Sequence, residues 1–269
     1  MSHRAEIGVF GGSGFYEFLT DVEEVLVDTP YGAPSDRVAL ATMGDRRVAF
    51  LPRHGRGHTH PAHAVNYRAN VWALHSLGVR QIIAPCACGS LQKDIHPGDF
   101  LVLDQFVDRT RGRSDTFFDG PVTHHIGAAE PYCPRLRKAA IRAAGRQGIA
   151  VREQGTIVVI QGPRFSTKAE SAWFTREGWD VVGMTQYPEA ILARELGICY
   201  AGIALVTDYD AGLAAESGEA VTIAAVLKTM ADNNSRVKEL IHAMVESLPA
   251  APDAACSCAE DARNSVMNG

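Results

Sequence analysis

Residues 199–212 read CYAGIALVTDYDAG, and this stretch indicates the fold class because it joins a continuous apolar run to two acids and a glycine. The run does not alternate between apolar and polar residues, which is typical of a strand covered on both faces. If the strand stays extended, Asp208 and Asp210 point the same way, because alternate residues share a face. The two acids could hold a metal, move a proton, bind a basic ligand or cap the next helix.

Similar apolar runs alternate along the chain with segments of helical periodicity. This alternation predicts a three-layer α/β/α sandwich with a mixed, largely parallel central sheet. We expect one domain over residues 1–248 and a mobile C-terminal tail over 249–269. The predicted strands are 7–10, 47–51, 81–85, 100–106, 156–161, 181–184 and 199–206, and the predicted helices are 66–77, 134–147, 167–177, 188–196 and 222–248.

Composition excludes several classes of protein. The chain has 269 residues, of which 46% are hydrophobic and 21% charged, as in ordinary globular proteins. A net charge of −5 argues against a nucleic-acid binder, which needs a dense basic face. No apolar run approaches the roughly 20 residues of a membrane helix, and the N-terminus lacks a signal-peptide core. We therefore expect a cytoplasmic protein that binds no membrane.

The six cysteines do not form a disulfide framework in a chain of this length. Cys256 and Cys258 form a C-x-C pair that is too close in sequence, and too isolated, for a zinc site with four ligands. We interpret the two as a free pair in the tail, and the alternative is a redox-active or cross-linked pair.

Several short motifs follow the predicted strands. Residues 11–14, GGSG, are either a tight turn or a phosphate loop in which Ser13 adds a hydroxyl. The run RHGRGHTH that begins at Arg53 favours a basic anion-binding loop, with a plain surface loop as the alternative. A metal site at its histidines is disfavoured because no acidic ligand lies nearby. Residues 85–91, PCACGSL, suit a turn of small residues whose backbone a ligand can approach closely, and Ser166 or Thr167 could cap a helix.

Ligands of open α/β folds gather at the carboxyl ends of the strands. Three of the five predicted strand ends offer donors to an anion, one offers a thioether and a hydroxyl, and one offers acids. A ligand with a phosphate at one end and a basic heterocycle at the other would fit this set. The five ends carry Ser13, Arg53 with His54, Cys86 with Ala87, Met184 with Thr185, and Asp208 with Asp210.

The ordered motifs GGSGFY, DTPYGAPS, RHGRGHT, VNYRANVWAL, CACGSL, PGDFLVLDQFVDRT, GPRFST, MTQYPEAILARELGICYA and ALVTDYDAG closely resemble those of the methylthioadenosine phosphorylases, in the trimeric branch of the purine nucleoside phosphorylases. The resemblance covers residues 6–245 and implies a pentosyltransferase of purine and methionine salvage. Such an enzyme uses phosphate to cleave 5′-methylthioadenosine into adenine and 5-methylthioribose 1-phosphate. The resemblance also implies a homotrimer or a dimer of trimers, no cofactor besides phosphate as co-substrate, and no metal.

The same resemblance assigns roles to individual residues. It implies a phosphate site of Ser13, Arg53, His54, Cys86, the backbone of Ala87, and Thr185. It places Met184 under the ribose, Phe165 and Ser166 beside the purine, and Asp208 and Asp210 at the purine N7 and 6-amino edge. It lines the 5′ pocket, closed by a neighbouring subunit, with His58, His125, Ile223, Val226 and Leu227. Cys86 departs from the family, because well-known relatives carry a Thr there and a thiol is a weaker donor.

The negative charge that builds up on the purine during the reaction explains why an acid is expected at N7. Breaking the glycosidic bond pushes negative charge into the purine, and a proton shared with Asp208 relieves that charge in the transition state. A carboxylate also accepts from a 6-amino group, whereas the family's enzymes for 6-oxopurines carry Asn in place of Asp208. The alternatives are a phosphorylase for methylthioinosine, inosine or guanosine, an enzyme for another 5′-modified adenosine, and a non-catalytic nucleoside-binding protein.

Overall fold

The structure is a computed structural model that describes residues 4–11, 20–213, 222–252 and 256–267 of the chain. Ser13, which the sequence places in a candidate phosphate loop, lies outside these residues. All other residues of the predicted site are described.

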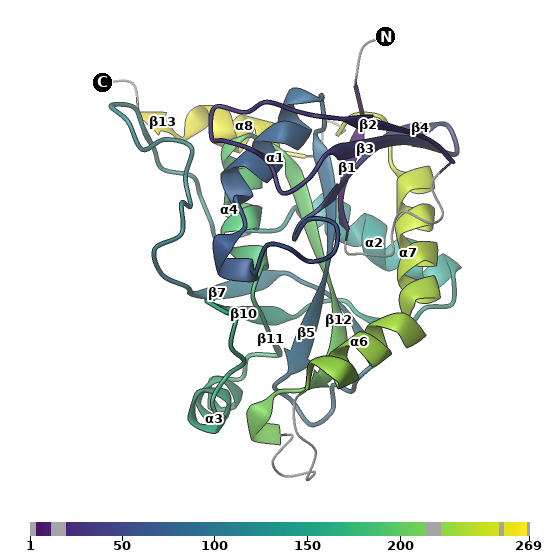
Figure 1. Cartoon of the computed structure of the whole chain (residues 1–269), viewed down its shortest axis with the longest axis vertical. Helices are drawn as coiled ribbons and strands as arrows, with labels where there is room; N and C mark the ends of the chain where they lie inside the picture. The colour runs from purple at the N-terminus through teal and green to yellow at the C-terminus, as the bar shows by residue number, and fades with distance from the viewer. Residues whose placement is uncertain (1–3, 12–19, 214–221, 253–255, 268–269) are drawn as a thin grey trace.

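A mixed sheet runs through the middle of the molecule (Figure 1). Its strands are β1 (Ile7–Gly11), β2 (Thr20–Val25), β3 (Val38–Met43), β4 (Arg46–Pro52), β5 (Gln81–Ser90), β6 (Phe100–Val102), β7 (Gln105–Arg109), β9 (Val151–Arg152), β10 (Thr156–Ile160), β11 (Val181–Gly183) and β12 (Cys199–Tyr209). The main path is β2-β3-β4-β1-β5-β11-β10-β7, and β12 joins it at β5 and leads through β6 to β9. Parallel pairs form the centre of the sheet, whereas β2–β3, β3–β4, β5–β11 and β6–β12 are antiparallel.

The central strands are apolar on both faces because each face has its own hydrophobic core. Phe10 of β1 and Tyr200 of β12 pack into one core, and their chain neighbours Val9 and Ala201 pack into the other. Alternate residues of a strand point to opposite faces, so a strand between two cores must be apolar throughout. This arrangement confirms the interpretation of the continuous run in residues 199–206.

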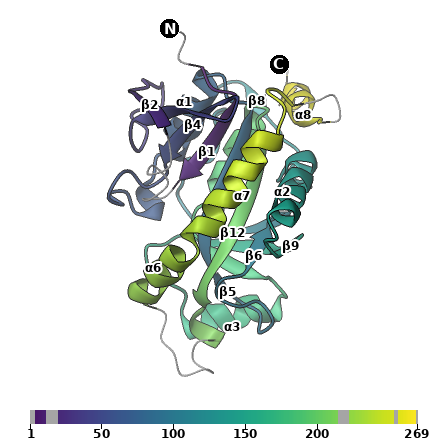
Figure 2. The ribbon, with the colours of Figure 1, turned by 90° about the vertical axis from the view of Figure 1, so that its right-hand side faces the viewer.

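Helices cover both faces of the sheet, which confirms the predicted sandwich. On one face α1 (Tyr67–Ser76) packs against α4 (Gln186–Glu195), and on the other α2 (Pro134–Arg146) packs against α7 (Asn234–Ser247). Figure 2 shows α2 and α7 running side by side along β12. The remaining helices are the short 3₁₀ helix η2 (Ala62–Ala64), α3 (Lys168–Arg176), α6 (Ile223–Asp232) and α8 (Cys258–Asn264).

β5 and β12 continue beyond their predicted ends. β5 reaches Ser90, so Cys86 and Ala87 lie inside a paired strand, and the turn predicted there was wrong. The parallel ladder to β12 keeps this backbone extended, with Ala87 opposite Leu205. The register shifts between Val206 and Asp208, which marks a β-bulge just before the first acid.

Two other predicted elements are divided in the structure. The predicted helix over 222–248 is two helices, α6 and α7, which meet at Asn233. The Asn233 side chain donates to the Thr229 carbonyl and accepts from Arg236, so it satisfies groups at both helix ends. The predicted strand over 100–106 is likewise two strands, β6 and β7.

The C-terminal segment, which the sequence predicts to be a mobile tail, contains α8 and the short strand β13 (Val266–Met267). β13 pairs with β8 (Thr123–His124), and α8 packs against α4 at the upper end of Figure 1. Gly197 allows this close packing, because a Cβ there would lie 3.0 Å from the Ala259 Cα. Cys258 and Ala262 are buried, so the segment makes an apolar contact that could not be expected from its largely polar sequence.

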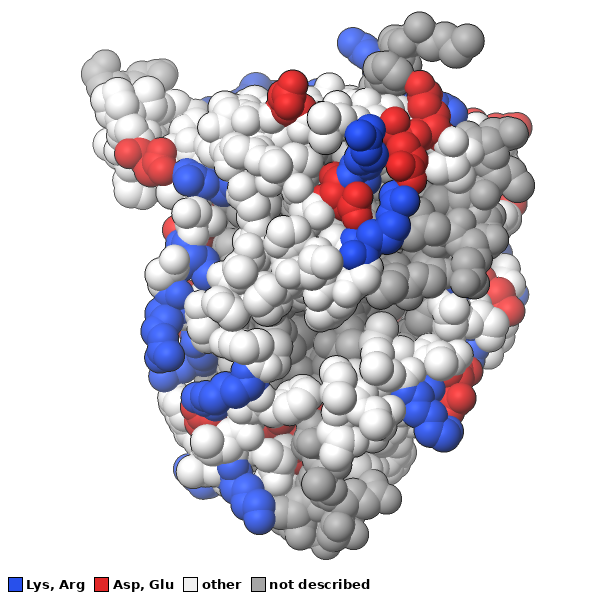
Figure 3. Space-filling view, viewed as in Figure 1, with Lys and Arg blue, Asp and Glu red and all other residues white. Residues whose placement is uncertain are grey.

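Acidic and basic side chains mix at the upper right of the face in Figure 3, over β2 to β4. Ion pairs such as Arg56–Glu24 and Arg47–Glu23 account for this mixture. Among the described residues, no helix is long and apolar enough to cross a membrane.

Candidate active site

A buried ion pair joins the end of β4 to the first turn of α4. Arg53 follows β4, and its Nε and Nη2 donate to the two carboxylate oxygens of Glu189 at 2.7 and 2.8 Å. Its Nη1 donates to the Pro85 carbonyl of β5 at 3.1 Å. Both charged side chains are at least 95% buried, and Tyr200 donates a further hydrogen bond to Glu189 at 2.6 Å. The fork-shaped pair therefore fixes the guanidinium between β4, β5 and α4.

The ion pair with Glu189 also keeps the buried Arg53 guanidinium positively charged. Burial by itself would lower the pKa of Arg53, but attraction to Glu189 outweighs burial and raises the pKa above its ordinary value. A guanidinium has five N–H donors, and the three contacts named above use three of them. Two donors remain for an anion.

His54 lies next to this pair with one ring nitrogen already engaged. Its Nδ1 lies 2.8 Å from the His60 carbonyl, which can only accept, so Nδ1 carries the proton. Burial lowers the pKa of His54 to about 4, and the neighbouring Arg53 adds to the effect. The ring is therefore neutral at pH 7, with Nε2 as an acceptor. The exposed ring of His58 stacks on it, with the ring centroids 4.3 Å apart.

Two further polar side chains lie on elements that Arg53 contacts: Cys86 on β5, which interacts with Arg53, and Thr185 at the start of α4. Burial raises the pKa of the Cys86 thiol to about 12, although Arg53 opposes the rise, so the thiol stays protonated. Thr185 is the N-cap residue of α4 and is buried, yet its hydroxyl makes no capping hydrogen bond. Tyr187 departs from helical geometry, so the regular turns of α4 begin at Pro188, and the Thr185 hydroxyl lies just before them, where it is available to an anion.

The two acids lie against Gly89 of β5. A Cβ at Gly89 would lie 3.1 Å from Asp208 Oδ1 and 3.4 Å from the Asp210 Cβ, so a larger residue there would crowd the Asp208 carboxylate. Asp208 is still within β12, after the bulge, and its Oδ2 accepts from the Thr207 hydroxyl at 2.7 Å. Burial raises the pKa of Asp208 to about 6 against the effect of Thr207, and the neighbouring Asp210 adds to the rise.

Asp210 follows the strand and is almost fully buried. Among the described residues, neither its Oδ2 nor the Oγ of Ser166 makes a hydrogen bond of ordinary geometry, although Ser166 is close enough to act on the Asp210 carboxylate. Burial raises the pKa of Asp210, although the Ser171 hydroxyl works against the rise. Buried polar atoms usually have partners, so these two atoms are where a bound ligand with donors and acceptors would fit.

The loops after β10 and β11 meet beside the acids. A Cβ at Gly162 would lie 2.7 Å from the sulfur of Met184, so the GPRFST loop approaches Met184 closely. Arg113 holds the two loops together, because its guanidinium donates to the carbonyls of Gln161, Met184 and Tyr187. Thr167 and Glu170 form a capping box at the start of α3, which confirms one of the two predicted caps.

The residues predicted for the 5′ pocket do not all come together in one chain. Ile223 and Leu227 lie one turn apart on α6 and are 63% and 57% exposed, whereas Val226 is buried. Phe165 is also exposed, at 39%. His125 follows β8, beside α8 and β13, at the opposite end of the molecule from α6 (Figures 1 and 2).

Sequence reasoning missed two residues that support the site. Glu189 holds Arg53 from 136 positions away, and Arg113 joins the two loops. One feature of the sequence could have indicated Glu189: it is an acid in the first turn of a predicted helix, directly after a buried strand, where an apolar residue would be expected. Arg113 lies in a run of arginines, and nothing in the sequence distinguishes it from its neighbours. The histidines and acids of this site form no group with metal-ligand spacing within the described part of the chain.

Comparisons with known proteins show the family of the chain. The family model for the phosphorylase superfamily matches residues 6–246. The chain is 55% identical over 264 residues to a purine nucleoside phosphorylase of Streptomyces coelicolor, covering 95% of this chain and 93% of the relative. It is 54% identical over 242 residues to the S-methyl-5′-thioadenosine phosphorylase of Mycobacterium tuberculosis, covering 89% and 88%.

Solved structures give the same result. Methylthioadenosine phosphorylase from Schistosoma mansoni in complex with tubercidin is similar with a TM-score of 0.89 and 40% identity, covering 97% of this chain and 99% of that one. A methylthioadenosine phosphorylase from an antarctic soil metagenomic library is similar with a TM-score of 0.91 and 38% identity, covering 98% and 93%.

Proposed function

We propose that this chain, which belongs to the phosphorylase superfamily and is a nucleoside phosphorylase, cleaves S-methyl-5′-thioadenosine with phosphate. The products are adenine and S-methyl-5-thio-α-D-ribose 1-phosphate, which serve purine and methionine salvage in the cytoplasm. The observation that carries the proposal is the pair of buried acids beside Gly89, one with its pKa raised to about 6, within a family of nucleoside phosphorylases.

Phosphate binds, in this proposal, beside the Arg53–Glu189 pair. The anion would bind to the two Arg53 donors that have no partner among the described residues and to the Thr185 hydroxyl, near the N-terminal end of α4. The family resemblance adds the Ala87 backbone and Ser13, which lies outside the described residues. Because Nε2 of neutral His54 is an acceptor, His54 either binds the hydroxyl of monoanionic phosphate or takes up a proton when the dianion binds. Because the Cys86 thiol stays protonated, it carries no negative charge that would repel the phosphate.

Asp208 supplies the proton that the departing purine needs. At pH 7 an acid with a pKa of about 6 is protonated in roughly one molecule in ten, compared with about one in a thousand at an ordinary Asp pKa. Desolvation by the bound purine raises this fraction further. Proton sharing with N7 relieves charge that exists only as the glycosidic bond breaks, so it accelerates the chemical step.

Asp210 and Ser166 would pair with the purine edge. The Asp210 Oδ2 and the Ser166 hydroxyl, neither of which makes a hydrogen bond of ordinary geometry among the described residues, could accept from a 6-amino group and donate to a ring nitrogen. An ionised carboxylate facing a 6-oxo group would instead place acceptor against acceptor. This chemistry favours adenine nucleosides.

A second substrate class remains a candidate because the Streptomyces coelicolor relative is named a purine nucleoside phosphorylase. In that case inosine, guanosine or methylthioinosine would react faster than methylthioadenosine. An adenosine with another 5′ substituent is a further candidate, because Ile223 and Leu227 are exposed apolar residues that any apolar substituent could contact.

The exposed apolar residues of α6 support assembly into a homotrimer or a dimer of trimers. Ile223 and Leu227 would be covered by a neighbouring subunit, and that subunit's own copy of the segment around His125 could complete the 5′ pocket. The separation of α6 from His125 within one chain is consistent with this arrangement. Light scattering at several protein concentrations tests it, and a monomer at every concentration would contradict it.

A panel of nucleosides, each with and without phosphate, tests the proposed function. Methylthioadenosine, adenosine, methylthioinosine, inosine and guanosine are compared at equal concentration, and the released base and sugar phosphate are identified by chromatography. We expect adenine from methylthioadenosine only when phosphate is present. Base release without phosphate, or faster release of hypoxanthine than of adenine, would contradict the proposal.

A further inference from the structure

Four cysteines that are distant in sequence come together at the upper end of the molecule. Cys133 is the N-cap residue of α2, Cys199 begins β12, and Cys256 and Cys258 lie at the start of α8. Their sulfur atoms all lie within 4.8 Å of one another. The sequence led us to expect no metal, because the Cys256–Cys258 pair lacked further ligands. The other two sulfurs come from positions 123 and 57 residues before Cys256.

The distances between the sulfurs fit a tetrahedral metal centre. Four thiolates at about 2.3 Å from a zinc ion lie roughly 3.8 Å from one another. The sulfur of Cys256 lies 3.8 Å from that of Cys133 and 3.1 Å from that of Cys199. A disulfide requires about 2.0 Å, and all four thiols are free in the structure. The four sulfurs therefore form a closed set that a small soft cation could fill with little movement.

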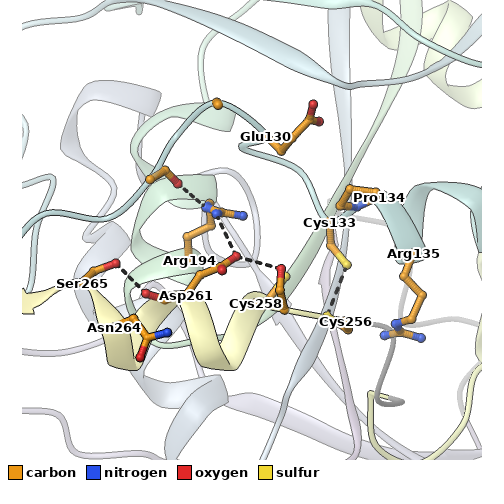
Figure 4. A pocket seen from close by; sticks show the side chains of 13 residues that line it. Glu130, Cys133, Pro134, Arg135, Arg194, Cys256, Cys258, Asp261, Asn264 and Ser265 are labelled. Atoms are coloured by element: carbon orange, nitrogen blue, oxygen red, sulfur yellow. Dashed lines mark hydrogen bonds and ion pairs between the residues drawn. The ribbon is translucent and has the colours of Figure 1, made fainter.

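The surroundings offset the negative charge that four thiolates would carry. The Arg135 guanidinium lies 3.7 Å from the Cys199 sulfur and is held there by the Gln81 side chain. Cys133 lies at the N-terminal end of α2, where the helix dipole favours an anion. Figure 4 shows Cys133, Cys256, Cys258 and Arg135 around one pocket, which has a volume of about 480 Å³.

We propose that Cys133, Cys199, Cys256 and Cys258 form a structural zinc site that holds the C-terminal segment against α2 and β12. Zinc suits the site because a set of four cysteines leaves no open position for substrate, which is typical of structural zinc. Binding replaces four S–H protons by four Zn–S bonds, and the protons go to solvent without any redox change. The site lies at the opposite end of β12 from the acids and takes no part in phosphorolysis.

The site would anchor more than one element. α8 continues into β13, which pairs with β8, and the His125 amide donates to the Ser265 carbonyl. His124 contacts the Ala262 carbonyl at 2.7 Å, and Arg194 of α4 contacts Asp261 at 3.5 Å. Metal bound at the start of α8 would therefore strengthen the attachment of a segment that these contacts and the packing of α8 on α4 hold in place.

The first test is the metal content of the full-length protein, purified without chelator and again after incubation with zinc and a thiol reductant. We expect about one zinc ion per chain, by elemental analysis, and four thiols protected from alkylation. Cobalt substitution should give the absorption bands of a tetrahedral thiolate centre. Zinc-free protein that takes up no metal, or a disulfide among these cysteines in protein purified under reducing conditions, would overturn the proposal.

The zinc content of cysteine variants tests whether these four cysteines, and not the others, bind the metal. Cys256→Ser/Cys258→Ser changes only the C-terminal segment and should lose the zinc and become cleavable by protease near α8. Cys256→His should keep the zinc, because imidazole can replace one thiolate although it cannot form a disulfide. Cys88→Ala, a buried cysteine outside the cluster, is the matched control and should keep the full zinc content. Unchanged zinc content in the double variant would contradict the assignment.

Discussion

The two ends of β12 differ in what they hold, although one strand of 11 residues forms both. At its start, Cys199 lies among three other cysteines, whereas near its finish Asp208 lies beside Gly89 and Asp210. Asp208 lies nine positions after Cys199, which is roughly 30 Å of extended chain. Both acids have raised pKa values, and Asp210 Oδ2 has no partner among the described residues, which suits a ligand that comes and goes. The four sulfurs form a closed set, which suits a permanently bound ion. β12, which lies between two hydrophobic cores, thus separates the proposed catalytic acids from the proposed zinc site.

The largest effect is expected from Asp208→Asn. Loss of a positioned general acid typically costs about 10²–10⁴-fold, so we expect kcat on methylthioadenosine to fall by that order. The KM for phosphate should change little, because Arg53 and Thr185 remain. Steady-state kinetics with each substrate varied in turn measures both, with Asp45→Asn, an exposed turn residue, as the control. Unchanged turnover would refute the proton-sharing role.

Arg53→Met should destabilise the fold and weaken phosphate binding together. The substitution leaves the Glu189 carboxylate buried without its partner, which costs about 3–5 kcal/mol. Urea denaturation measures the free energy of unfolding, and the double variant Arg53→Met/Glu189→Gln should recover part of the stability but none of the phosphate affinity. If the double variant recovered both, the assignment of Arg53 to the phosphate site would be wrong.

At the other end of β12, Cys256→Ser/Cys258→Ser should lower the melting temperature without altering the chemistry. Loss of about 1–3 kcal/mol corresponds to roughly 3–10 °C in a domain of this size. The dependence of kcat/KM on pH should keep its shape, because no group near Asp208 changes. Differential scanning calorimetry and a pH profile test the two halves of this prediction. A shifted profile would mean that the two ends of the strand are coupled.

The pH profile of kcat/KM reports on Asp208 in the free enzyme. The pKa of Asp208 is raised to about 6, and the protonated form is the active one. The activity is therefore fully present below about pH 6 and is lost as the pH rises through that value, by tenfold per unit well above it. Rates measured at saturating phosphate between pH 5 and 9 test the direction. A profile that rises over this range would contradict an acid role for Asp208.

The smallest effect is expected from Thr207→Val. The Thr207 hydroxyl donates to Asp208 Oδ2 and lowers the pKa of Asp208, so its removal should raise that pKa further. A hydrogen bond of about 1 kcal/mol corresponds to less than about one pH unit. The descending limb of the profile should move to higher pH by that amount. Thr175→Val, which removes a hydroxyl bonded to the Leu91 carbonyl, should leave the limb in place.

Much of the site was predictable because parallel strands bring their carboxyl ends to one edge of a sheet. Arg53, Thr185 and the two acids each follow or end a strand, and the structure places Arg53 against Pro85 and the acids against Gly89 of the same strand, β5. The fold class followed from the same strands, because apolar residues on both faces require cover on both faces. The ladder that extends β5 to Ser90 could not be seen in the sequence, since it depends on the partner strand β12.

The features that could not be predicted from the sequence depend on contacts between residues that are distant along the chain. Glu189 is recognisable only as the partner of Arg53, 136 positions away. The cysteine cluster is recognisable only once α8 docks on α4, where Gly197 gives it room. The break at Asn233 was also hidden, because α6 and α7 have helical periodicity on either side of it.

The most direct test of the central claim compares methylthioadenosine with methylthioinosine at saturating phosphate, in the wild type and in Asp208→Asn. The two substrates share their 5′ substituent and differ only at the 6-position that faces the acids. We expect the wild type to prefer methylthioadenosine by at least about tenfold in kcat/KM, and the variant to lose most of that preference. A wild-type enzyme that prefers methylthioinosine, or a variant with the same preference as the wild type, would contradict the account.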